Sequence, residues 1–198
     1  MTAREMGFET SAALPLLEVP RRPRNLDEIL GRLLCLHCVA ACAYGLDRAR
    51  AAGWLAHEGL EPLLTATEAA FLRSGTGDGA RFRVAVESIW VLAWELQLVA
   101  TLDFSRQCDG RFVELMPNLK SGDSSLGLRS RVSLRPVTEL FAACDLAFCL
   151  HWTVRDRALR ASHPPRKDGL AQGVISARRH ALEWSLFGED WDEISLDT

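Results

Sequence analysis

Hydrophobic residues recur at helical spacing along most of this chain. Between Leu26 and Cys42 the apolar side chains fall three or four positions apart, which is the period of a helix with one buried face. Asn25 stands before this run with Glu28 three positions later, the pattern of a capping box that begins a helix. Gly45 follows the run and is typical of a helix end. We therefore expect a first helix between these two signals.

Similar start and stop signals predict the other helices. Cap residues, prolines and glycines separate each apolar run from the next. The run at 81–101 is apolar on nearly all sides, so we expect it to be central, with the helices of Trp152 and Trp184 packed around it. Alternating patterns typical of strands are not sustained anywhere, which argues against a sheet. The expected helices lie at about 47–57, 65–74, 81–101, 136–161 and 170–187, with a short one at 111–116 as an open alternative.

These patterns predict an all-α fold, a single-domain irregular helical bundle of about six to eight helices over residues 24–198. Residues 1–23 carry three prolines and no sustained period, so we expect a flexible N-terminal arm. Residues 103–132 are the least regular part, rich in glycine and serine. A connection of that length is typical of an insertion or a lid.

Composition narrows the classes of protein. The chain has 198 residues, 48% hydrophobic and 25% charged, which are ordinary values for a globular domain. Its 23 basic and 26 acidic residues give a net charge of −3, which does not favour nucleic-acid binding. The chain has no run of about 18 consecutive apolar residues, which argues against a membrane span, and it has no secretory signal. Six cysteines without such a signal are typical of reduced thiols. We therefore expect a cytoplasmic protein that binds no cofactor, membrane or nucleic acid.

The cysteines offer weak candidates for metal binding. Cys35, Cys38 and Cys42 share one face of the first helix, and zinc requires four ligands. Cys144 or Cys149 would have to supply the fourth. Because zinc sites usually pair ligands across a turn, core packing is the favoured interpretation and we expect no metal.

A single cysteine in the irregular segment is a separate candidate. Cys108 stands near Arg106 and Arg111, whose charge could lower the pKa of its thiol. No base is assigned to it, so it is a weak candidate nucleophile.

His151 is the candidate catalytic residue if the chain is an enzyme. It lies beside an apolar stripe, where a histidine can act as a general base with Asp145 or Asp156 as its orienting carboxylate. The alternative is a histidine at the boundary of the core, hydrogen-bonded to a carbonyl or a carboxylate. We favour this structural role and assign no catalytic residue.

Charged residues near the C-terminus suggest either a clamp or an anion site. Arg178 and Arg179 can pair with Asp192, Asp197 and the terminal carboxylate, because guanidinium groups match carboxylates bidentately. Trp191 would then anchor the C-terminal segment. The functional alternative is an anion-binding pocket, for which the candidate residues are Arg135, Arg155, Arg178 and Arg179.

Three segments resemble a bacterial family called domain of unknown function 4272 (DUF4272). They are 83–96, which includes Trp90 and Trp94; Leu134-Arg135-Pro136 with Asp145 to Trp152; and Arg178 to Trp184 with the ending 191–198. The resemblance covers about residues 24–198. It implies an all-helical fold and carries no settled activity. Where the family has Glu before its Arg and Asn before its Trp, this chain has Ala177 and Glu183, so a polar site at those positions would be altered here.

No motif specifies a reaction, so we expect a non-catalytic protein-binding module. One concrete form is an immunity-type protein, whose protein partner is a bacterial toxin that it neutralises by occlusion. The alternative is an enzyme of unrecorded type with an anion-binding pocket around His151, Arg178 and Arg179. A metal or redox sensor built on the cysteine face is the third interpretation.

Overall fold

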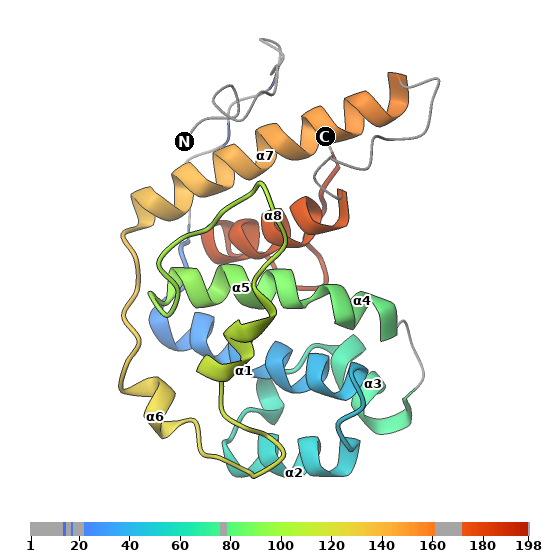
Figure 1. Ribbon diagram of the computed structural model, residues 1–198, viewed down its shortest axis with the longest axis vertical. Helices are drawn as coiled ribbons and strands as arrows, with labels where there is room; N and C mark the ends of the chain where they lie inside the picture. Colours follow the sequence, from blue (N-terminus) through green and yellow to red (C-terminus); the bar gives the residue numbers. More distant parts are fainter. Residues whose placement is uncertain (1–13, 15–16, 18–21, 76–78, 161–171, 198) are drawn as a thin grey trace.

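Helices account for most of the chain that the structure describes (Figure 1). The computed structural model describes residues 14, 17, 22–75, 79–160 and 172–197, without the side chains of 157–160. This part forms a single-domain bundle without a β-strand, which confirms the predicted all-α class. Most of the arm expected at 1–23 lies outside the described residues. The helices are α1 Leu26–Ala43, α2 Arg48–His57, η1 Glu61–Leu63, α3 Ala66–Ser74, α4 Gly79–Val84, α5 Val86–Glu95, η2 Gly110–Leu115, α6 Leu126–Arg129, α7 Val137–Arg160 and α8 Gln172–Phe187.

The larger helices are stacked in layers. In Figure 1 the order runs from α7 through α8 and α5 to α1, with α2 and α3 at the far end. α8 packs between α7 and α5, and α5 packs on α1. The expectation of a central α5 is therefore right for its contact with α8. It is wrong for α7, which packs chiefly on α8 and lies one layer further out.

Local capping explains where the helices begin. Asn25 and Glu28 form both hydrogen bonds of a capping box at the start of α1, and Thr65 and Glu68 do the same for α3. The side chain of Asp47 accepts from the backbone N–H of Arg50 at the start of α2. These three starts were expected from the sequence because each needs only neighbouring residues.

The apolar run at 81–101 does not form one helix. A turn at Ala85 separates α4 from α5, and α5 ends at Glu95. Gln97 adopts a left-handed conformation with φ of 57°, and the N–H of Leu98 donates to the carbonyl of Ala93 at 2.8 Å. This is a Schellman ending with glutamine in the position that glycine usually takes. Because no glycine marks it, the sequence pattern overran the end of the helix.

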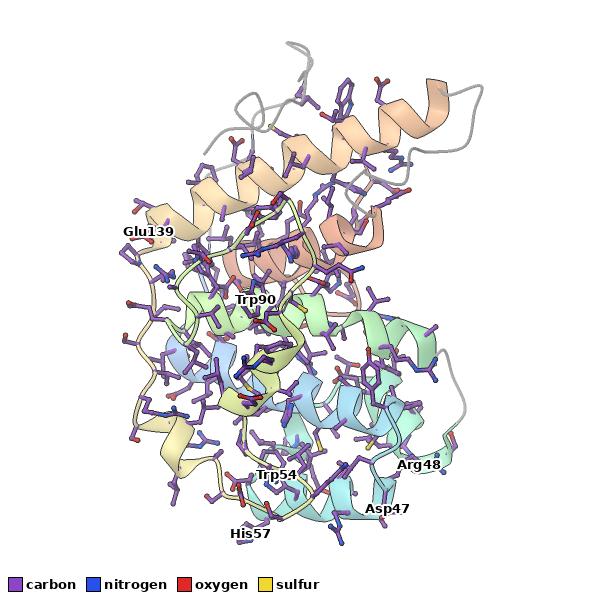
Figure 2. All side chains as sticks on the ribbon, in the orientation of Figure 1. Asp47, Arg48, Trp54, His57, Trp90 and Glu139 are labelled. Atoms are coloured by element: carbon purple, nitrogen blue, oxygen red, sulfur yellow. The ribbon has the colours of Figure 1, made fainter. Side chains whose placement is uncertain are left out.

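The irregular segment that follows α5 crosses the front of α5 and α1 in Figure 1. Side chains from the helices satisfy its backbone: His37 bonds the carbonyl of Pro117 at 3.0 Å, and the indole N–H of Trp54 donates to that of Asp123 at 2.8 Å. Trp90 packs edge-on against Phe112. Figure 2 labels Trp54 and Trp90 beside this segment. These contacts fasten the segment to the bundle rather than leaving it as a lid.

The 24-residue helix α7 is unusual in composition. Its residues Val137–Asp156 form the one stretch, within the described chain, that is long and apolar enough to cross a membrane. Its inner face packs along α8, with Leu140, Ala147 and Leu150 almost fully buried.

Candidate functional site

Arg178 lies at the centre of a fully buried polar network. It has no exposed surface, and its Nε and Nη2 donate to one carboxylate oxygen of Glu87 at 2.9 and 2.7 Å. Its remaining donors reach the carbonyls of Asp103 at 2.6 Å and Arg106 at 2.9 Å. The N–H of Cys108 donates to the second oxygen of Glu87 at 3.0 Å. The guanidinium therefore binds the start of the irregular segment and is closed to an external anion.

Arg179 belongs to a second network between α7 and α8. Its Nε donates to Glu183 at 2.7 Å, and its Nη1 donates to Nδ1 of His151 at 2.6 Å. Nη1 also lies 3.3 Å from the carbonyl oxygen of Leu196. Burial, followed by the charges of Arg179 and Arg155, lowers the pKa of His151 to about 4. His151 is therefore neutral near pH 7, and its Nδ1 accepts a hydrogen bond from the guanidinium of Arg179, which stays protonated.

The orienting carboxylate expected for His151 is not in place. Asp145 is exposed on α7, and no hydrogen bond joins it to His151 within the described chain. Asp156 is half-buried further along the same helix. The guanidinium of Arg179 occupies the position at Nδ1 that an orienting carboxylate would need. The partner of Nδ1 is therefore a guanidinium, whereas the structural alternative had expected a carbonyl or a carboxylate.

The four arginines proposed for an anion pocket lie in different surroundings. Arg135 caps the end of α5, donating from Nε to the carbonyl of Trp94 at 2.7 Å and from Nη2 to two further carbonyls. Arg155 is 41% exposed and lies 3.8 Å from Asp197. Arg178 and Arg179 serve separate buried networks. The structure does not gather them into one concave site.

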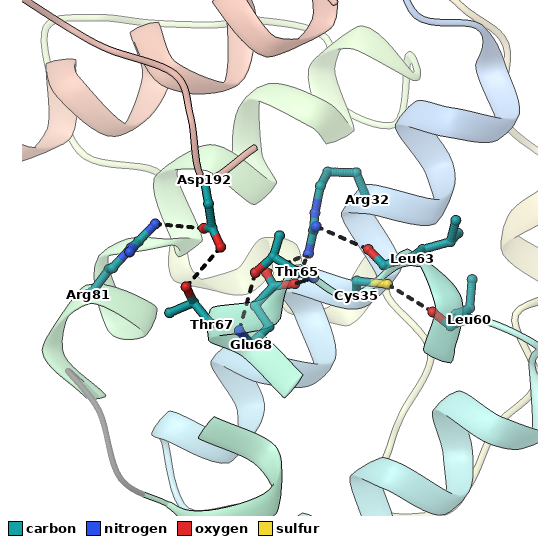
Figure 3. A network of polar contacts seen from close by, with 9 residues as sticks. All are labelled: Arg32, Cys35, Leu60, Leu63, Thr65, Thr67, Glu68, Arg81 and Asp192. Carbon is teal, nitrogen blue, oxygen red and sulfur yellow. Dashed lines mark hydrogen bonds and ion pairs between the residues drawn. The ribbon is translucent and has the colours of Figure 1, made fainter. Parts of the chain in front are cut away.

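The C-terminal segment is anchored, although not by the expected ion pairs. The ring of Trp191 is buried edge-on against His180 and Trp184. Asp192 accepts from Thr67 at 2.8 Å and pairs with Arg81 at 3.0 Å (Figure 3). The expected pairing of Arg178 and Arg179 with Asp192 and Asp197 is therefore wrong, because the two arginines find nearer carboxylates inside the core. The terminal carboxylate of Thr198 lies outside the described residues.

Figure 3 also shows a buried ion pair that sequence reasoning missed. Arg32 of α1 donates to both oxygens of Glu68 at 2.5 and 2.6 Å, with 4% and 2% of the two side chains exposed. Glu68 also closes the capping box of α3 by accepting from the N–H of Thr65. The guanidinium of Arg32 lies over the ring of Trp191 at 5.1 Å. The capping box was a signal for Glu68, but nothing local indicated its partner 36 residues away.

A cavity of about 460 Å³ lies beside this network. Its walls are mostly apolar and include Phe82 and Trp191, and its polar groups include Ser176, His180 and Asp192. Burial is the main cause that lowers the pKa of His180 to about 4. The cavity therefore offers an uncharged imidazole and hydroxyl groups to a small molecule. The carboxylate of Asp192 in its wall is already paired with Arg81.

The cysteine candidates are placed as core residues. The thiols of Cys35 and Cys38 face the carbonyls of Leu60 and Ala51 at 3.7 and 3.5 Å. Burial raises the pKa of Cys35 to about 12 and that of Cys42 to about 11. Within the part of the chain that the structure describes, no three histidine, cysteine or acidic side chains are grouped for a metal ion. These thiols are protonated donors rather than thiolate ligands.

The surroundings of Cys108, the weak candidate nucleophile, do not activate its thiol. Burial, followed by the nearby carboxylate of Glu87, raises its pKa to about 12. Arg106 pairs with Asp103 instead, with its Nε 3.0 Å from the carboxylate Oδ2.

The most distinctive surface feature is an apolar groove between the end of α1, α4 and η2. Tyr44, Val84 and Val113 are 65%, 45% and 50% exposed, and all three line this groove of about 620 Å³. A neighbouring groove of about 740 Å³ shares Tyr44 and Val113 and continues to Lys120. We call this combined surface the Tyr44 groove. Exposed apolar side chains gathered at a concave surface are typical of interaction sites.

The family model described as a domain of unknown function, DUF4272, matches residues 2–194. The chain belongs to the DUF4272 family. This confirms the resemblance seen in the sequence and extends it to almost the whole chain. No curated protein and no solved structure matches the chain. For this DUF4272 member, function must be argued from its own geometry.

Proposed function

We propose that this chain is a non-catalytic binding module whose partner is another protein, and that the Tyr44 groove is the contact surface. The observation that carries the proposal is the gathering of Tyr44, Val84 and Val113 along one groove. Burying exposed aromatic and aliphatic side chains in an interface is favourable because it removes apolar surface from water. Tyrosine is also enriched among the residues that dominate binding energy.

The wall of the groove is pre-organised, which favours binding. Arg178 and Glu87 hold the backbone of residues 103–108 from inside the bundle. His37 holds the carbonyl of Pro117 at the opposite end of the segment. A surface that is ordered before binding avoids part of the entropy cost of association. Among the candidate catalytic and anion-binding side chains, in contrast, Arg135, Arg178, Arg179 and His151 are already engaged in internal hydrogen bonds.

The concrete form of this function is that of a cytoplasmic immunity protein that occludes a bacterial toxin. An occluding inhibitor needs a rigid surface and no active site. The pre-organised wall of the Tyr44 groove supplies the rigid surface. Growth rescue of cells that express a toxin encoded beside this chain tests the specific role.

The binding surface is tested separately by affinity capture. Tyr44→Asp and Val113→Asp should each lose a protein that the wild-type chain retains, because a carboxylate would have to be desolvated in the interface. Leu126→Asp is the matched control, since Leu126 is 72% exposed on α6 and outside the groove. Equal capture by all variants, with circular dichroism confirming folding, would refute the groove as the contact surface.

A further inference from the structure

The contact between α7 and α8 combines buried apolar side chains with a buried polar cluster. Among the described helices, α7 makes its extensive contact with α8 alone. The interface contains four chemically active side chains that are at most 8% exposed: Cys144 and His151 from α7, and Arg179 and Glu183 from α8. We call this set the α7–α8 seam. A buried polar group is costly unless it is hydrogen-bonded. The protonation states of these side chains therefore affect how firmly α7 is held on α8.

The seam is assembled around one guanidinium. Arg179 donates to the carboxylate of Glu183 at 2.7 Å and to Nδ1 of His151 at 2.6 Å. The ring of Phe148 lies 4.7 Å from the centre of this guanidinium. The acceptors bonded to the guanidinium of Arg179 thus come from α8 itself (Glu183), from α7 (His151) and from the C-terminal segment (the carbonyl of Leu196). Of these, the imidazole of His151 is the polar link between the two helices.

Protonation of His151 would reverse the sign of this link. A proton on Nδ1 removes the acceptor and places a second cation 2.6 Å from Arg179, in surroundings that exclude water. We propose that the His151–Arg179 contact is an acid-sensitive latch, which releases α7 from α8 while α1 and α5 remain folded.

The other charges around His151 do not cancel this repulsion. On α7, Arg155 adds positive charge, Cys144 is an uncharged thiol, and Asp145 and Asp156 lie exposed or half-buried. On α8, Glu183 is already bound to Arg179. The further groups are Glu95 of α5, whose pKa is raised by burial to about 8, and Asp197 of the C-terminal segment, which is 90% exposed and 3.8 Å from Arg155.

Release would uncover a large apolar surface. The buried side of α7 carries Leu140, Ala147 and Leu150. This surface is separate from the Tyr44 groove, so the latch goes beyond the proposed function. Opening of the latch therefore exposes in acid an apolar face of α7 that is hidden near pH 7.

The direction of the pH effect follows from the burial of His151. The ordinary pKa of histidine is 6.5, and in the closed seam it is lowered to about 4. The closed state is therefore fully favoured above pH 6.5 and loses stability as the pH falls toward 4. For one titrating group, the equilibrium constant for opening rises by up to about tenfold per pH unit in this window.

Hydrogen exchange of the full chain between pH 7 and pH 4, read by mass spectrometry as protection factors, tests the latch. We expect α7 and α8 amides to lose up to about tenfold protection per pH unit below pH 6.5, while α1 and α5 retain theirs. In His151→Gln this dependence should be absent, because the amide oxygen still accepts from Arg179 and does not titrate. Simultaneous loss in α1 and α5, or an unchanged dependence in His151→Gln, would overturn the proposal.

His180→Gln is the matched control. His180 is a second histidine whose pKa is lowered to about 4, and it lies against Trp191 outside the seam. This variant should keep the wild-type pH dependence of α7, and loss of that dependence would contradict the latch. If His151→Gln does not fold, nitrogen-15 NMR of the wild-type imidazole decides instead. His151 should stay neutral until α7 amides exchange, and a protonated His151 in the closed seam would overturn the latch.

Discussion

Arg178 of α8 and Glu87 of α5 form a buried ion pair, with Nε and Nη2 of the arginine both donating to one carboxylate oxygen at 2.9 and 2.7 Å. The same two side chains hold the backbone of Asp103, Arg106 and Cys108. One buried pair thereby connects the central helices to the irregular segment that forms the wall of the Tyr44 groove.

Removing one member of this pair should be strongly destabilising. Arg178→Met leaves the carboxylate of Glu87 buried without its cation, which costs about 3–5 kcal/mol of unfolding free energy. Urea denaturation followed by circular dichroism measures this change. Arg155→Ala is the control and should cost less than about 1 kcal/mol, because its partner Asp197 is 90% exposed. Similar losses in both variants would show that the buried pair does not hold the segment.

Glu95 should make stability decrease toward alkaline pH. Its side chain has no exposed surface, accepts one hydrogen bond from Ser185 at 2.8 Å and has a second oxygen without a partner in the described chain. Burial raises its pKa from 4.5 to about 8, so the folded state keeps a proton that the unfolded state releases. The contribution of Glu95 to the free energy of unfolding should therefore fall between about pH 4.5 and pH 8 and then level off.

Glu95→Gln should remove this contribution. Its unfolding free energy, compared with that of the wild type at each pH, should show a difference that grows up to about pH 8. The control is Glu114→Gln, since Glu114 is 67% exposed. A wild-type curve parallel to that of Glu95→Gln would mean that Glu95 is ionised or hydrated in the folded protein.

Two glycines should respond to alanine in opposite directions. Gly75 ends α3 with φ of 67°, and a Cβ there would overlap the guanidinium of Arg48. Gly75→Ala should therefore cost more than about 1 kcal/mol. Gly53 lies inside α2 with open space around it, so Gly53→Ala should stabilise the chain by about 0.5–1 kcal/mol. Thermal unfolding of both variants checks the signs, and a stabilising Gly75→Ala would contradict the left-handed ending.

The thiols should react slowly. Because burial raises the pKa of Cys108 to about 12, its labelling by a disulfide reagent at pH 8 should be much slower than that of free cysteine.

Treatment with a zinc chelator should leave the melting temperature unchanged, since Cys35 and Cys38 face backbone carbonyls. Rapid labelling of Cys108, or a lower melting temperature after chelation, would contradict these placements.

Local signals in the sequence predicted the helix starts well. The capping boxes at Asn25 and Thr65 and the left-handed Gly75 involve residues close together in the chain, so their geometry follows from local chemistry. The end of α5 was missed for the opposite reason. Gln97 adopts a left-handed conformation that glycine usually occupies. Arg135, which is 41 residues from Trp94 in the sequence, donates to the carbonyl of Trp94 at the end of the helix.

The all-helical class, most helix boundaries and the family could be predicted from the sequence, because they depend on periodicity, caps and motifs along the chain. Tertiary structure alone decided which charges meet. Arg178 finds Glu87, Arg179 finds Glu183 and His151, and Arg32 finds Glu68. The terminal aspartates that the sequence offered as partners lie at the surface instead. Buried guanidinium groups must be satisfied by whatever acceptors the packing brings within reach, and packing depends on the shapes of whole helices rather than on distance along the chain.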